Sequence, residues 1–106
     1  MNLPRIDKLK ALVTSQPDDP RARYFLANEL FRAEDWEGAA EQLEAYVGLS
    51  GGDDGAAFRS LGLALDRLGR KERAADAYRK GIESALKHGH DGLAGELRDL
   101  LDELSG

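Results

Sequence analysis

Two histidines and an aspartate stand close together in the segment His88-Gly89-His90-Asp91. Two imidazoles and a carboxylate are suitable ligands for zinc or nickel. No further set of strong ligands is visible in the sequence, and Gly89 is typical of the turn that ends a helix. The alternative is a solvated loop in which His88 interacts with the negative end of a helix. We favour the loop and therefore expect no metal site and no cofactor.

The remaining reactive side chains do not form a recognisable catalytic group. The acidic residues are spread along what the pattern indicates are solvated helix surfaces. The sequence contains no glycine-rich phosphate loop, no serine nucleophile elbow and no cysteine. Because no general acid can be paired with a general base, we assign no catalytic residues and do not expect an enzyme.

The composition is that of a small acidic protein. Its 106 residues, 42% of them hydrophobic, are enough to bury one core, so we expect a single domain over 1–106. With 15 Lys and Arg against 20 Asp and Glu, the formal net charge of −5 repels nucleic acid phosphates and anionic membrane surfaces. No signal peptide and no apolar run of membrane-spanning length is recognisable. We expect a cytoplasmic protein that binds neither nucleic acid nor membranes.

Apolar residues recur at helical spacing along almost the whole chain. Ala, Leu, Glu and Arg are abundant, whereas β-branched residues are scarce. The pattern predicts an all-α protein with about six helices, separated by clusters of Gly, Pro and Asp. The expected helices are 3–15, 20–33, 36–48, 55–68, 71–87 and 91–104.

Local chemistry accounts for several of these helix ends. Asp19 can accept bonds from the free N–H groups at the start of the second helix, and Pro20 suits its first turn. Gly69 and Gly89 can adopt the left-handed conformation that ends a helix. Aspartates are also expected to cap two further helices, Asp53 or Asp54 the fourth and Asp91 the sixth.

The helices contain an internal repeat. A shift of 35 residues places small residues on small ones and large on large: Leu26 on Leu61, Ala27 on Gly62, Leu30 on Leu65, Ala39 on Ala74, Leu43 on Tyr78 and Val47 on Ile82. A shift of 34 from the first helix places Leu9 on Leu43, Leu12 on Tyr46 and Val13 on Val47. We therefore divide the chain into a half repeat (3–15), two full repeats (20–53 and 55–88) and a C-terminal capping helix (91–104).

This pattern resembles the tetratricopeptide repeat family, in which units of about 34 residues each form two helices. The second repeat carries the family's characteristic residues, Phe58, Leu61, Gly62, Leu65, Ala74 and Tyr78. The first repeat departs from the pattern where Arg23 replaces an aromatic residue and Gly51 replaces a proline. The resemblance extends over residues 3–87 and includes small bacterial proteins of this type. It implies a solenoid of antiparallel helical hairpins that binds proteins without catalysis.

The resemblance also implies that the first helix of each hairpin lines a concave groove for a partner peptide. The residues at the family's groove positions are Arg21, Tyr24, Asn28, Phe31, Arg32, Arg59, Leu63, Asp66 and Arg67. Arginine presents a planar fork of donors that suits carboxylates, so we expect an extended or helical partner segment with acidic groups. The alternative is that these arginines are solvated or pair with acids such as Asp66. Asn28 can bond a peptide backbone or only water.

Four aromatic residues are assigned mainly to packing. Trp36, Phe58 and Tyr78 are favoured as core residues over a role in stacking on a ligand, because buried aromatics dominate core energetics. Tyr46 stands where the family usually has a small residue. We expect it either to fill a gap or to widen the angle against the first helix.

Two other functions remain as alternatives to the peptide-binding adaptor. The first is self-association as a homodimer, if part of the apolar face of the first helix, comprising Ile6, Leu9, Leu12 and Val13, is left uncovered. The second is a secretion or assembly chaperone that shields an apolar segment. A groove rich in arginine disfavours the chaperone.

Overall fold

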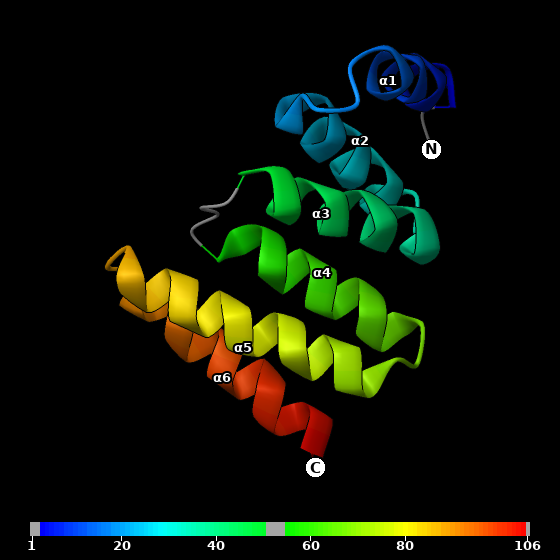
Figure 1. The fold of residues 1–106 in the computed structure, drawn as a ribbon. Coiled ribbons are helices and arrows are strands. Elements are labelled where there is room, and N and C mark those ends of the chain that lie inside the picture. Colours follow the sequence, from blue (N-terminus) through cyan, green and yellow to red (C-terminus); the bar gives the residue numbers. More distant parts are fainter. Residues whose placement is uncertain (1–2, 51–54, 106) are drawn as a thin grey trace.

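The regular structure of the chain is entirely helical in the computed structural model, which describes residues 3–50 and 55–105 (Figure 1). The helices are α1 (Leu3–Ser15), α2 (Pro20–Arg32), α3 (Trp36–Ser50), α4 (Ala56–Arg67), α5 (Lys71–Lys87) and α6 (Asp91–Ser105). Every bound lies within two residues of the one predicted from the sequence. The prediction of an all-α fold built from helical hairpins is confirmed.

The helices form a stack in which each one packs against the next along the chain. α2, α4 and α6 run in one direction and α3 and α5 in the other, and the two termini lie at opposite ends of the stack (Figure 1). Ion pairs show which alternate helices share a face. Arg59 of α4 contacts Glu96 of α6, whereas Arg73 of α5 contacts Glu44 of α3.

The helix ends follow the local chemistry of their residues. The Asp19 carboxylate accepts a hydrogen bond of 2.9 Å from the backbone N–H of Arg21, which confirms the predicted cap of α2. Gly69 and Gly89 have φ of 77° and 76°, so both adopt the expected left-handed conformation. Glu34, which the 35-residue shift places on Gly69, has φ of 60° and thus adopts this conformation despite its side chain.

Two predicted caps have different outcomes. Asp53 and Asp54 lie outside the described residues. The residue that precedes α4 is Gly55, with φ of 113°, and a Cβ there would lie 2.9 Å from the carbonyl oxygen of Gly81. Asp91 is itself the first residue of α6. Its carboxylate therefore lies in the first turn, where the helix dipole favours negative charge.

The residues that the 35-residue shift superposes are buried alike. Leu26 and Leu61 lie in the core, as do Leu30 and Leu65, and the equivalent alanines Ala39 and Ala74 have no exposed surface. Phe58 differs from the expectation for a core aromatic because it is only half-buried. Equivalent positions of the two hairpins therefore meet equivalent apolar surroundings, as a repeated packing unit requires.

Tyr78 of α5 lies over Gly62 of α4, where the two helices pack closely. A Cβ added at Gly62 would stand 2.2 Å from the Tyr78 ring, closer than any real contact. In the preceding hairpin the equivalent positions hold Ala27 and Leu43, both fully buried. In the α4–α5 hairpin, a glycine thus faces a large ring. In the α2–α3 hairpin, the methyl group of Ala27 is combined with the smaller side chain of Leu43.

This size relation predicts coupling between the two positions. Gly62→Ala is expected to lower the free energy of unfolding by about 1–3 kcal/mol through overpacking, although alanine is the better helix former. Adding Tyr78→Leu recreates the Ala27 and Leu43 combination. We expect the double variant to be at least about 1 kcal/mol more stable than the sum of the single effects in urea unfolding.

The matched control is Gly95→Ala in α6, where a new Cβ meets no atom within 4 Å. This substitution is expected to raise stability by about 0.5–1 kcal/mol, because alanine favours the helix. Additive effects of Gly62→Ala and Tyr78→Leu would contradict the proposed steric relation.

Burial of Tyr78 also affects its ionisation. The side chain is 1% exposed, and removal from water, together with the nearby charges of Asp66 and Glu103, raises the pKa of Tyr78 to about 12. The unfolded chain loses this proton near pH 10, whereas the folded chain retains it up to about pH 12. Stability conferred by the neutral phenol is therefore complete below pH 10 and is lost as the pH rises through this window.

The test compares the wild type with Tyr78→Phe in urea unfolding at several pH values between 9 and 12. The wild type is expected to lose more stability than the variant as the pH rises. Ultraviolet titration of the folded wild type should show a phenol that ionises near pH 12. Parallel stability curves for the two proteins would show that Tyr78 ionises as an exposed phenol does.

Candidate functional site

The predicted groove residues occupy equivalent positions on α2 and α4. The 35-residue shift places Tyr24 on Arg59, Asn28 on Leu63, Phe31 on Asp66 and Arg32 on Arg67. None of these residues is fully buried, because the buried stripes of the two helices comprise other positions. Since α2 and α4 run in the same direction, the C-terminal ends of both helices lie on the same side of the stack (Figure 1).

Phe31, Trp36 and Arg67 form a cluster that links three helices at that end. The rings of Phe31 and Trp36 meet edge to face with centroids 5.0 Å apart. The guanidinium of Arg67 lies 5.4 Å from the centre of the Trp36 ring, in a cation–π contact. Trp36 packs partly against the core, as predicted, but the sequence did not reveal that α4 supplies an arginine to its ring.

The side chain of Arg67 takes part in no ion pair or hydrogen bond within residues 3–50 and 55–105. The equivalent residue of the first repeat, Arg32, donates to Glu29 at 2.9 Å. Glu29 also pairs with Arg5 of α1 at 2.8 Å. The side chain of Asn28 is half-buried and makes no hydrogen bond with any described residue. Arg67 and Asn28 therefore have donors that are not used inside the described part of the chain.

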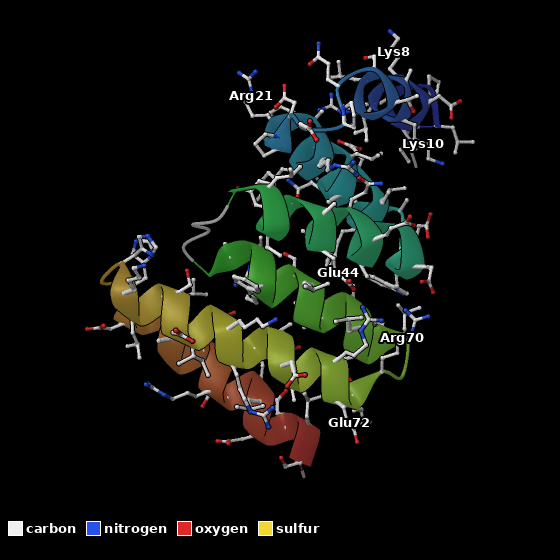
Figure 2. All side chains as sticks on the ribbon, viewed as in Figure 1. Lys8, Lys10, Arg21, Glu44, Arg70 and Glu72 are labelled. Carbon is white, nitrogen blue, oxygen red and sulfur yellow. The ribbon has the colours of Figure 1, made fainter. Side chains whose placement is uncertain are left out.

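Tyr24 and Arg21 are placed differently from the rest. Tyr24 packs against Tyr46 of α3 with ring centroids 4.8 Å apart, and both side chains are partly buried against the core. Arg21 lies at the opposite end of α2, where its side chain is 82% exposed (Figure 2). Its hydrogen bonds hold the pKa of Asp19 below the usual value, while Asp19 raises the pKa of Arg21.

The C-terminal helix adds negative charge beside α4. Arg59 donates to Glu96 of α6 at 2.7 Å, and its Nε atom is buried without a partner among the described residues. The exposed side of α6 carries further acids, including Asp99 and Glu103. Asp66 pairs with Lys71 at 3.6 Å. Among the predicted groove residues, the positive charge is therefore concentrated on α2 and at Arg67.

Comparison with known proteins decides the family. A model described as tetratricopeptide repeat matches residues 1–86 of the chain. The chain belongs to the tetratricopeptide repeat family. The match covers α1 to α4 and all of α5 except its last residue. Domains of this family generally mediate protein–protein interactions and are typically not catalytic.

A solved structure agrees with the tetratricopeptide fold. The solution structure of a protein from Bordetella parapertussis superposes with a TM-score of 0.77 at 22% sequence identity. The match covers 99% of this chain and 89% of that chain. The search of curated proteins gave no match.

The tetratricopeptide pattern did not predict the role of Arg23, which stands at a position that is aromatic in the family. Its Nε donates to the carbonyl oxygen of Pro17 at 2.9 Å, and Nη1 donates to the side chain of Gln42 in α3 at 3.1 Å. Arg23 thus ties the α1–α2 turn to α3. A charged residue at an otherwise aromatic position was the signal, but its partners depend on the fold.

The two histidines considered as metal ligands lie on other elements than the predicted groove residues. His88 and His90 have ring centroids 6.3 Å apart, and Nδ1 of His88 lies 2.8 Å from the carbonyl oxygen of Ser84 at the end of α5. The described residues contain no group of three His, Cys, Asp or Glu side chains arranged to hold a metal ion. Nor is any described helix long and apolar enough to cross a bilayer.

Proposed function

We propose that the chain is a non-catalytic adaptor that binds an acidic segment of a partner protein across α2 and the C-terminal end of α4. One observation carries this proposal: Arg67 lies on the ring of Trp36 and has no carboxylate partner within the described residues. Trp36 is half-buried, and tryptophan and arginine are among the residue types enriched in the hot spots of protein interfaces.

The neighbouring residues extend this surface along α2. Arg32 follows Phe31 in the chain, and its side chain is 70% exposed. Its partner Glu29 also pairs with Arg5, so loss of the Arg32 ion pair does not leave Glu29 without a partner. A carboxylate of the partner can therefore compete for Arg32 at little cost. Asn28 adds an amide that can donate to a peptide carbonyl and accept from a peptide N–H.

Charge sets the limit of the proposed surface. The acids of α6 lie beside Arg59 and repel an acidic segment that crosses the N-terminal half of α4. The proposed partner therefore follows α2 towards Arg67 and does not continue over α6. Leu63 and Arg59, which the family resemblance includes in the groove, then lie at its margin.

The test uses acidic peptides selected from a displayed random library and then synthesised. Trp36 is the only tryptophan of the chain, so its fluorescence reports directly on the proposed site during titration. Arg67→Ala is expected to raise Kd at least 10-fold, which corresponds to about 1.4 kcal/mol. Asn28→Ala should have a smaller effect of the same sign.

A matched pair of substitutions separates this surface from general electrostatics. Arg32 and Arg79 are both exposed and both pair with an acid three residues earlier on the same helix, but Arg79 lies on α5. Arg32→Ala should weaken binding several-fold, whereas Arg79→Ala should leave Kd within two-fold. Equal effects of the two substitutions would remove α2 from the proposed site.

A second candidate function, self-association, is favoured by exposed apolar residues at the N-terminal end of the stack. Ile6 and Val13 of α1 are buried against α2, but Leu12 is 39% exposed and Phe25 of α2 is 52% exposed. Such side chains are suited to contact with another copy. If they form a dimer, light scattering should show a mass that rises with concentration, and Phe25→Ser should abolish the rise. A constant monomer mass would exclude this function.

A further inference from the structure

The opposite face of the stack, formed by α1, α3 and α5, contains two hollows. One has a volume of about 500 Å³ and lies between α1, α2 and α3. The other has a volume of about 280 Å³ and lies between α3, α4 and α5. Ligand pockets usually have volumes of about 300–1,000 Å³. The larger hollow lies within this range, and the smaller hollow lies just below it. The proposed function does not use either hollow.

The two hollows lie at equivalent positions of the repeat. The larger is lined by Val13, Leu26 and Leu30, and the smaller by Val47, Leu61 and Leu65. Shifts of 34 and 35 residues superpose these two sets of three. Each hollow therefore has an equivalent apolar floor, and the two lie on either side of α3.

The rims of the hollows differ in charge. Glu44 of α3 pairs with Arg73 of α5 across the smaller hollow, and both residues line it. The repeat shifts place Lys10 and Gly38 at the equivalent positions of the larger hollow. No ion pair crosses the larger hollow among the described residues, and Gly38 supplies no charge at the position equivalent to Arg73. Figure 2 labels Lys10, Glu44 and Arg70, which follow one another along the stack.

The helix between the hollows is acidic. The charged residues of α3 are Glu37, Glu41 and Glu44, with no lysine or arginine. Glu37 and Glu44 are paired with Arg70 and Arg73. Glu41 is exposed, lines the larger hollow and makes no ion pair or hydrogen bond within residues 3–50 and 55–105. A ligand that crosses α3 therefore meets an unpaired negative charge between two apolar recesses.

We propose that this face binds an extended segment of a partner protein with one apolar side chain in each hollow and basic residues over α3. A helix with its side chains is about 10–12 Å across, and extended chain advances about 3.3 Å per residue. This distance corresponds to between about three and four steps along the chain. Four steps, with three intervening residues, span about 13 Å and place both apolar side chains on the same side of the extended segment. This surface is distinct from the proposed acidic-peptide surface, so the chain can join a basic segment on one face to an acidic segment on the other.

The probe is a synthetic peptide with two leucines separated by three Lys or Arg residues, titrated against isotope-labelled protein. Binding is expected to shift the methyl signals of Val13 and Val47 together, because the peptide occupies both hollows. The signals of the Trp36 indole should not move. A peptide with serine in place of both leucines should bind at least 10-fold more weakly. Equal affinity for the two peptides would show attraction by charge alone and would overturn the proposal.

Charge substitutions test the role of α3 without altering the core. Glu41→Lys is expected to raise Kd for the leucine peptide at least 10-fold, and Lys10→Glu to lower it several-fold. The control is Asp99→Lys, which reverses an exposed acidic residue of α6 that has no ion pair among the described residues and should leave Kd within two-fold. Equal effects of Glu41→Lys and Asp99→Lys would overturn the proposal.

One further variant keeps this proposal separate from the proposed function. Arg67→Ala should leave the affinity for the leucine peptide unchanged, because Arg67 does not line either hollow. Loss of leucine-peptide binding in Arg67→Ala would show that the basic peptide binds on the face that carries Arg67. This result would overturn the proposed site at the two hollows. Loss of acidic-peptide binding alone is the result expected if both surfaces are used.

Discussion

The close contact of paired helices is the constraint on which the rest of this structure depends. Tyr78 can be fully buried only because Gly62 leaves room for its ring, and in the neighbouring hairpin Ala27 and Leu43 meet under the same requirement. Once the helices of each hairpin are held at this distance, the residues on their outer sides are fixed relative to one another. The Phe31, Trp36 and Arg67 cluster follows from this arrangement, since its members come from three different helices.

The rims of the two hollows differ because the repeats share their apolar residues more strictly than their charged ones. Equivalent core positions hold residues of similar size, whereas Lys10 and Gly38 of one hollow correspond to Glu44 and Arg73 of the other. Packing between hairpins restricts the core positions, but a solvated charge contributes little to folding and is free to vary. The chemistry that could distinguish one partner from another therefore lies on the rims and outer faces.

The sequence was sufficient to predict the helices and their repeat, because these depend on nearby residues. Pro20, Gly69 and Gly89 determine helix ends through their own backbone preferences, and the apolar spacing determines which side of each helix is buried. Contacts between helices were not predictable in the same way. The bond from Arg59 to Glu96 joins residues 37 apart, so it depends on how α6 lies beside α4. The left-handed backbone of Glu34 had no residue-type signal, since glycine is the usual choice there.

The unlike residues at the two close contacts have a consequence for assembly of the chain. Repeated sequences risk pairing a helix with the counterpart of its proper neighbour during folding. Here α4 cannot lose its glycine without clashing with the tyrosine ring, and α2 in that place would bring the methyl group of Ala27 against Tyr78. The α4–α5 hairpin therefore accepts α4 better than it would accept α2, so steric fit as well as chain connectivity favours the observed order of the stack.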